Sequence, residues 1–168
     1  REENLDITAN FQKLIGMLNH LAENRGSEVL VSTHPRTRKK IDKHNLTLNK
    51  NVRLLQPLCF TDYLSLQMNA KAVLSDSGTI NEEAAMLGFA ALNIRETHER
   101  PEAMEKGGAV LVGLNVDRMI QALDIVEEQA SNNKKYFGLV PDYEEPLVSE
   151  NIVRIILSYT NYVKRVVW

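Results

Sequence analysis

Short β-branched runs alternate with helical stretches along most of this chain, and this alternation constrains its fold more than any other feature. Apolar side chains at helical spacing predict a first helix with Thr8 as its N-cap, ending near Gly26. Short apolar runs between polar breaks predict strands at 28–32, 52–55, 72–74, 91–94 and 110–112. Helical composition falls at 36–44, 62–69, 81–87 and 116–130, and a last helix begins near 149.

Successive strands separated by helices indicate a parallel sheet, because a parallel neighbour needs a long return connection that is usually helical. The helices then cover both faces of the sheet. The fold class expected is therefore α/β, a Rossmann-like doubly wound parallel sheet. A chain of 168 residues is long enough for one such domain that buries about 70% of its unfolded surface, so we expect residues 1–168 to form a single domain.

Charge and cysteine content exclude several classes of protein. The 20 basic and 22 acidic side chains nearly cancel, so no overall field attracts nucleic acid or an anionic membrane. No apolar run approaches the ~20 residues that cross a bilayer. The single cysteine, Cys59, excludes an internal disulfide and favours a reducing, cytoplasmic location. The first residue is not methionine, and we expect the chain to be part of a longer protein.

The densest polar motif is the segment 75–83, which follows a predicted strand and opens a predicted helix. In open α/β sheets, ligands bind at the carboxyl ends of strands, where helix N-termini offer N–H groups to anions. Gly78 allows a phosphate to approach the backbone, Ser77 and Thr79 add hydroxyl donors, and Glu83 could accept two ribose hydroxyls. The same residues also fit an ordinary turn and helix cap.

A second motif, 95–102, follows the next strand and crowds arginines, carboxylates and a histidine into one loop. Arg100 could hold a diphosphate or a sugar hydroxyl through its planar guanidinium, and Glu99 could orient it. His98 lies in the same loop. The alternative is a solvated loop of surface ion pairs.

Weaker candidates accompany these two loops. His34 and Arg36 follow the first strand, where a ligand at the sheet edge would lie, although a lone histidine is more often structural. The basic run at 36–43 lacks aromatic residues and fits the solvated face of a helix better than a nucleic-acid site. Tyr63 could stack on a base or pack in the core.

The last helix has an apolar stripe that includes Ile152, Ile155, Tyr159 and Val163. We expect this stripe to pack within the domain. A missing partner surface is the alternative.

Together the motifs resemble the non-hydrolysing UDP-N-acetylglucosamine 2-epimerases. That family carries the patterns His-Arg-Glu-Asn, Asp-Ser-Gly-Gly-x-Gln-Glu-Glu, Arg-x-Thr-Thr-Glu-Arg-Pro-Glu and Leu-Val-Gly. The counterparts here, in the same order and at similar spacing, are residues 1–4, 76–83, 95–102 and 111–113. The resemblance spans nearly the whole chain.

The resemblance implies the C-terminal half of a glycosyltransferase-B-like enzyme of two Rossmann-like domains. It implies that Ser77 and Gly78 hold the diphosphate of a UDP-sugar, Glu83 the ribose and Tyr63 the uracil, with Thr79 close to the sugar or diphosphate. Two arginines, Arg1 and Arg100, complete the implied site. The implied reaction inverts C2 by eliminating and re-adding UDP, without metal or other cofactor.

The implied acid and base carboxylates belong to an N-terminal domain, so we expect this chain alone to bind without catalysing. The resemblance implies that this domain and a second copy of the enzyme are its partners. Departures at Thr79, Asn81 and His98 look like the branch that acts on 6-deoxy sugars such as UDP-N-acetyl-L-talosamine or fucosamine precursors, in capsule and O-antigen synthesis. Two further alternatives are the donor-binding half of a glycosyltransferase and a non-enzymatic assembly module that uses the last helix.

Overall fold

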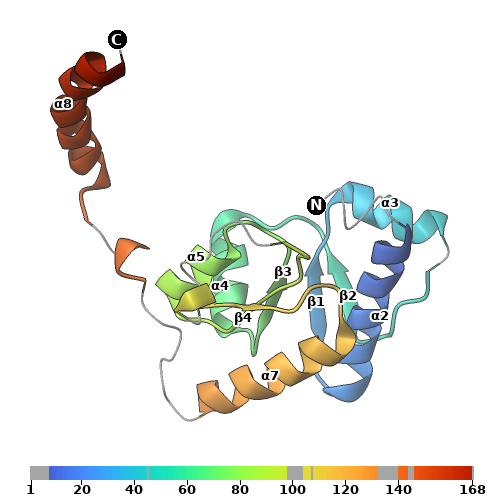
Figure 1. The fold of residues 1–168 in the computed structure, drawn as a ribbon. Helices are drawn as coiled ribbons and strands as arrows, with labels where there is room; N and C mark the ends of the chain where they lie inside the picture. The colour runs from blue at the N-terminus through green and yellow to red at the C-terminus, as the bar shows by residue number, and fades with distance from the viewer. Residues whose placement is uncertain are drawn as a thin grey trace.

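The structure is a computed structural model and describes residues 8–44, 46–97, 104–106, 108–131, 140–143 and 146–167 (Figure 1). Helices and strands alternate as predicted, and most boundaries lie within two residues of those expected. In chain order the elements are α2 (Thr8–Asn24), β1 (Val29–Ser32), α3 (Pro35–Lys43), β2 (Val52–Leu55), α4 (Phe60–Asn69), β3 (Val73–Ser75), α5 (Ile80–Leu87), β4 (Ala91–Asn93), β5 (Val110–Leu111), α7 (Val116–Ser131), the 3-10 helix η1 (Pro141–Tyr143) and α8 (Val148–Val167). Thr8, the expected N-cap, is the first residue of α2.

The strands pair in parallel, as the alternation predicted. β1 pairs with β2, and β4 lies between β3 and β5. The described strands thus form two sheets, one of β1 and β2 and one of β3, β4 and β5. Val29 of β1 and Leu74 of β3 nevertheless pack against the same apolar core. Lys71, just before β3, also donates to the Ser27 hydroxyl before β1 at 3.2 Å. β1 and β3 therefore pack against the same core, although they belong to different sheets.

The central strand β4 has neighbours on both of its faces. Leu92 is fully buried against Met17 of α2 and Met119 of α7. Ala91, which points to the opposite face, packs against Ile80 of α5. Helices thus cover both faces of the sheet, which confirms the predicted doubly wound α/β fold.

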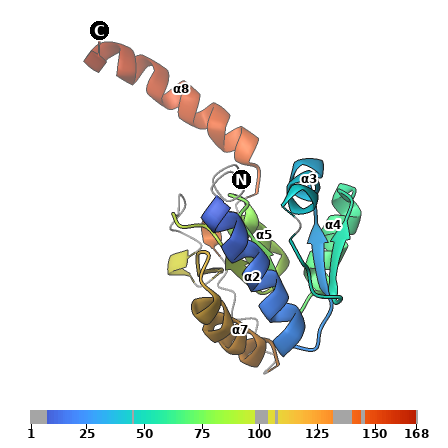
Figure 2. The same cartoon turned by 90° about the vertical axis from the view of Figure 1, so that its right-hand side faces the viewer.

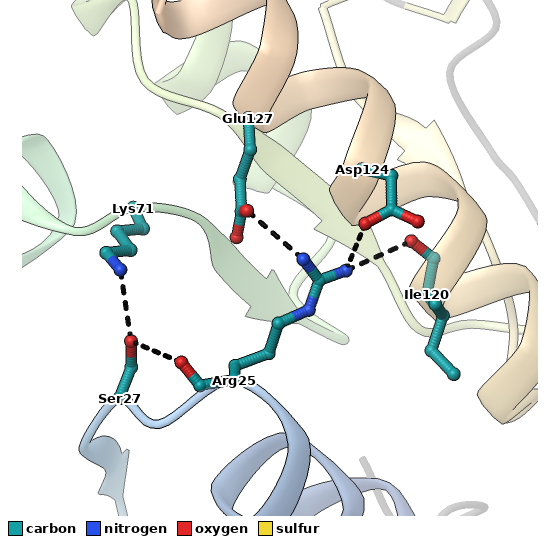
Figure 3. A network of polar contacts seen from close by, with 6 residues as sticks. All are labelled: Arg25, Ser27, Lys71, Ile120, Asp124 and Glu127. Carbon is teal, nitrogen blue, oxygen red and sulfur yellow. Dashed lines mark hydrogen bonds and ion pairs between the residues drawn. The ribbon is translucent and has the colours of Figure 1, made fainter.

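A polar network joins the end of α2 to α7 (Figure 3). The Arg25 guanidinium lies 2.6 Å from the Asp124 carboxylate and 3.2 Å from that of Glu127. It also donates to the carbonyl of Ile120 at 3.4 Å. The Arg25 side chain is 25% exposed, whereas those of Asp124 and Glu127 are 61% and 35% exposed, so water partly screens both ion pairs. The network holds α2 and α7 together on one face of the sheet.

The last helix, α8, projects away from the rest of the domain in both views (Figures 1 and 2). Every side chain described between Val148 and Val166 is exposed except that of Asn151. The expectation that its apolar stripe packs within the domain is therefore wrong, because nothing in the described domain covers it. None of the helices in the described part of the chain combines the length and apolar character needed to cross a membrane.

A chain that ends at Leu147 should retain the stability of the full chain, because α8 buries almost nothing against the domain. The free energy of unfolding, measured by urea denaturation, should change by less than about 0.5 kcal/mol. A loss of more than about 2 kcal/mol would contradict this arrangement, since it would mean that α8 packs against the domain in solution.

Candidate functional site

The two predicted loops leave the sheet from the same edge. β3 and β4 are adjacent and parallel, and Ser75 at the end of β3 pairs with Asn93 at the end of β4. The amide of Ile94 donates to the Ser75 carbonyl at 3.0 Å, which extends the ladder into the start of the second loop. The segments 76–79 and 95–97 therefore begin side by side. Arg1, His98, Glu99 and Arg100 lie outside the described residues.

Serine hydroxyls shape the turn between β3 and α5. The Ser77 amide donates to the hydroxyl of Ser75 at 3.1 Å, and the Thr79 amide donates to the hydroxyl of Ser77 at 3.3 Å. Thr79 occupies the N-cap position of α5, but its side chain makes no capping hydrogen bond. The turn-and-cap interpretation of this motif is thus correct for the turn, while the Thr79 hydroxyl has another partner.

That partner is Glu83, one turn into α5. The Thr79 hydroxyl donates to Glu83 Oε1 at 2.6 Å, and an ionised carboxylate only accepts. Ser77 Oγ lies 3.0 Å from Thr79 Oγ1. Because the Thr79 proton is directed to Glu83, Ser77 is the donor in this pair. The hydrogen bonds therefore run in one direction, from Ser77 through Thr79 to Glu83.

Helix α4 adds two side chains to the same place. Gln67 Nε2 donates to Glu83 Oε2 at 2.8 Å, and Gln67 is only 2% exposed. Tyr63 precedes Gln67 by four residues, so both project from one face of the helix. Sequence reasoning missed Gln67, and its spacing from Tyr63 was the only signal. The structure thus brings the candidates Tyr63 and Glu83 together with a buried amide.

Tyr63 is half-buried beside two carboxylates. Burial raises the pKa of its phenol above the ordinary value, and the negative charges of Glu83 and Asp76 raise this pKa further. Both charges act on the phenol, so the ring lies near Glu83 and Asp76. Tyr63 is therefore partly packed in the protein and partly open to solvent.

Asn81 lies in the same motif but is directed into the protein. It is only 1% exposed, in contrast to the exposed Ser77 and Thr79. The first turn of α5 therefore directs the Asn81 side chain inward, whereas Ser77 and Thr79 face outward.

His34 has a structural role, which was the alternative to ligand binding considered for it. It is the N-cap of α3, and its Nδ1 accepts a hydrogen bond from the Arg36 amide at 3.3 Å. Both side chains are exposed at the carboxyl end of β1. In the basic helix α3 only Ile41 is buried, as expected for a solvated face.

A polar cavity of about 300 Å³ lies at the carboxyl ends of β4 and β5. Glu96, at the start of the second loop, accepts a hydrogen bond from the Leu114 amide at 3.2 Å. Gly113 has a φ of 62°, and a Cβ there would lie 3.3 Å from both Glu96 oxygens. Glu96 thus fixes the second loop against the loop after β5. The cavity is lined by Lys13, Arg95, Glu96, Leu111, Val112, Gly113, Leu114, Asn115 and Arg118.

No three His, Cys, Asp or Glu side chains in the described ranges are grouped so that they could hold a metal ion. The polar groups that surround the Ser77 turn are hydroxyls, an amide, a phenol and carboxylates. Such a set suits recognition of a polar organic ligand through hydrogen bonds.

Known proteins similar to this chain are named UDP-N-acetylglucosamine 2-epimerases. The family model described as UDP-N-acetylglucosamine 2-epimerase matches residues 1–157. The UDP-N-acetylglucosamine 2-epimerase of Methanocaldococcus jannaschii is 32% identical over 166 residues, which cover 96% of this chain and 43% of that relative. The chain therefore spans less than half the length of the relatives it matches.

Solved structures show the same likeness. A structure described as UDP-N-acetylglucosamine 2-epimerase from Rickettsia bellii is similar with a TM-score of 0.83 and 46% identity, over 95% of this chain and 44% of that one. The M. jannaschii enzyme in complex with UDP-GlcNAc and UDP is similar with a TM-score of 0.79 and 31% identity, over 94% of this chain and 43% of that one.

The variant Glu83→Gln should lower the pKa of Tyr63 while leaving it above the ordinary value, because burial and Asp76 remain. Ultraviolet titration of tyrosinate measures this pKa, with the Tyr63→Phe titration subtracted. Because the folded pKa is raised, the stability that Tyr63 contributes is complete below the ordinary pKa and is lost as pH rises through the raised one. Glu28→Gln, remote from Tyr63, is the control. An unchanged Tyr63 pKa in Glu83→Gln would show that the two groups do not interact.

Proposed function

The chain belongs to the UDP-N-acetylglucosamine 2-epimerase family, and we propose that it supplies the UDP-binding domain of an enzyme that inverts C2 of a UDP-2-acetamido sugar. The observation that carries this proposal is the convergence of Tyr63, Ser77, Thr79 and Glu83 at one edge of the sheet. The similar M. jannaschii structure, described as a complex with UDP-GlcNAc and UDP, supports the nucleotide as the ligand.

Each part of UDP has a proposed partner. The diphosphate lies against Ser77 and Gly78 at the N-terminal end of α5, where hydroxyls and the helix dipole favour an anion. The ribose hydroxyls donate to Glu83, whose two oxygens each retain a lone pair after accepting from Gln67 and Thr79. The uracil stacks on Tyr63, which is partly open to solvent.

The charges for the reaction come from residues beyond this cluster. We propose that Arg100 and Arg1 approach the diphosphate, with Glu99 orienting Arg100 and His98 beside the sugar. Donors fixed around the departing diphosphate stabilise the negative charge that it gains as the bond from C1 breaks. The carboxylates that move the C2 proton are proposed to lie in the part of the enzyme that this chain does not span, so the chain alone binds without catalysing.

The partner proposed for α8 is the remaining part of the longer enzyme, its N-terminal domain. The support is the apolar stripe, in which Ile152 and Ile155 are 50% and 57% exposed, together with the share of the relatives' length that this chain leaves out. In the longer protein, removal of α8 should then lower the thermal midpoint, in contrast to its effect on this chain.

A homodimer of the longer protein and a cytoplasmic location, which suits the exposed free thiol of Cys59, are part of the same proposal.

An alternative substrate is a 6-deoxy UDP-2-acetamido sugar of capsule or O-antigen synthesis. Its support is the departure at Thr79, where a threonine replaces the second glycine of the family pattern. Comparing turnover of UDP-N-acetylglucosamine with that of its 6-deoxy analogue by the longer enzyme would distinguish the two substrates.

The isolated chain should bind UDP, and the variant Glu83→Ala should bind it about tenfold or more weakly, because a charge-assisted hydrogen bond contributes roughly 1.5–3 kcal/mol. Isothermal titration calorimetry measures both affinities. The matched control is Glu28→Ala, which removes an exposed carboxylate paired with Arg53 at 2.8 Å, at the amino end of β1. Absence of UDP binding by the folded wild-type chain, or equal weakening by both variants, would refute the proposed site.

The longer enzyme, supplied with UDP-N-acetylglucosamine and no acceptor, should exchange the C2 proton with solvent deuterium and form the C2 epimer, as NMR detects. A glycosyltransferase would instead release UDP only when an acceptor is added. Acceptor-dependent release without exchange would favour the transferase.

A further inference from the structure

Helix α4 buries a glutamine, while apolar residues of the same helix are exposed. Gln67 is the one residue of α4 described as buried, while its neighbours Leu66 and Met68 are 38% and 55% exposed. Burying an amide costs free energy unless it is hydrogen-bonded, and an apolar side chain in its place would not carry that cost. The arrangement therefore suggests that Gln67 serves something other than stability.

Only the nitrogen of the Gln67 amide makes a hydrogen bond to the described residues. Gln67 Nε2 donates to Glu83 Oε2 at 2.8 Å, whereas its buried Oε1 accepts no hydrogen bond from the described residues. The contact between α4 and α5 thus gives the amide a single specific partner, a carboxylate that is itself only half-buried.

Gln67 and Thr79 hold the Glu83 carboxylate from two sides. Thr79 donates to Oε1 at 2.6 Å and Gln67 donates to Oε2 at 2.8 Å. With a donor on each oxygen, rotation of the carboxylate about its terminal bond breaks both hydrogen bonds, so its plane is fixed. The remaining lone pairs of the two oxygens then present a preformed acceptor pair to a vicinal diol.

We propose that Gln67 is a positioning residue, whose buried amide orients the Glu83 carboxylate to accept both hydroxyls of the nucleotide ribose. This inference rests on the proposed function, in which Glu83 contacts the ribose. A glutamate that is free to change rotamer loses conformational entropy when it binds a ligand. A glutamate that is already held in place does not have this entropy cost on binding. The amide therefore increases affinity for the diol without touching the ligand.

The experiment compares two probes, UDP and 2′,3′-dideoxy-UDP, which lacks the ribose diol. Wild-type chain should bind UDP about tenfold or more tightly than the dideoxy analogue. Gln67→Met, an apolar side chain of similar volume, should reduce this preference to roughly threefold or less and leave dideoxy-UDP affinity unchanged. Its thermal midpoint should equal or exceed that of wild type, because the unpaired amide oxygen is gone.

The matched control is Asn69→Met. It removes an amide from the same helix, but this amide is exposed and donates to the Ser65 carbonyl within α4. The control should keep the wild-type preference for UDP.

The outcomes separate the inference from the proposed function. A wild-type preference retained in Gln67→Met would overturn the positioning role while leaving Glu83 as the ribose contact. Equal weakening of both probes, with a lowered thermal midpoint, would show that Gln67 only maintains the fold. A wild-type chain that binds both probes equally would refute the ribose contact itself.

Gln67→Glu provides a second test if the methionine variant does not fold. This isosteric side chain repels Glu83 while both are ionised and can donate to it once a proton is shared. The preference for UDP over dideoxy-UDP should therefore rise as pH falls, whereas that of wild type should stay constant over the same range. A preference that does not depend on pH in Gln67→Glu would contradict the positioning role.

Discussion

The parallel pairing of β3 with β4 is the constraint on which the rest of the site depends. Because Ser75 pairs with Asn93, the turn that carries Ser77 and the loop that begins at Arg95 start at the same edge of the sheet. The pairing holds because β4 is buried on both faces, with Leu92 against α2 and α7 and Ala91 against α5. The Arg25 network at the end of α2 keeps two of these helices together (Figure 3).

From this edge, the polar groups form one connected set rather than separate contacts. Hydrogen bonds run from Ser77 through Thr79 to Glu83, and Gln67 reaches Glu83 from the neighbouring helix. A ligand that engages Glu83 thereby also affects the hydroxyls beside the proposed diphosphate position. In the proposed function, the turn and the first turns of α5 form one recognition surface for the diphosphate and the ribose of the nucleotide.

Much of the fold could be predicted from the sequence, because strand and helix periodicity are local properties. The strand Val52–Leu55 has the predicted boundaries, and the polar turn at Ser77 lies at the predicted strand end. Gln67 could not be predicted, since its burial depends on how α4 packs against α5. For α8 the apolar stripe was visible, yet periodicity shows only that a face is suited to burial and does not identify what covers it.

The most direct test of this account is a crystal structure of the chain with UDP. The account predicts the diphosphate against Ser77 and Gly78, the ribose hydroxyls on the Glu83 carboxylate and the uracil against Tyr63. A nucleotide bound instead at the amino ends of the strands, or in the cavity beside Gly113 and Arg118 with Glu83 untouched, would contradict it.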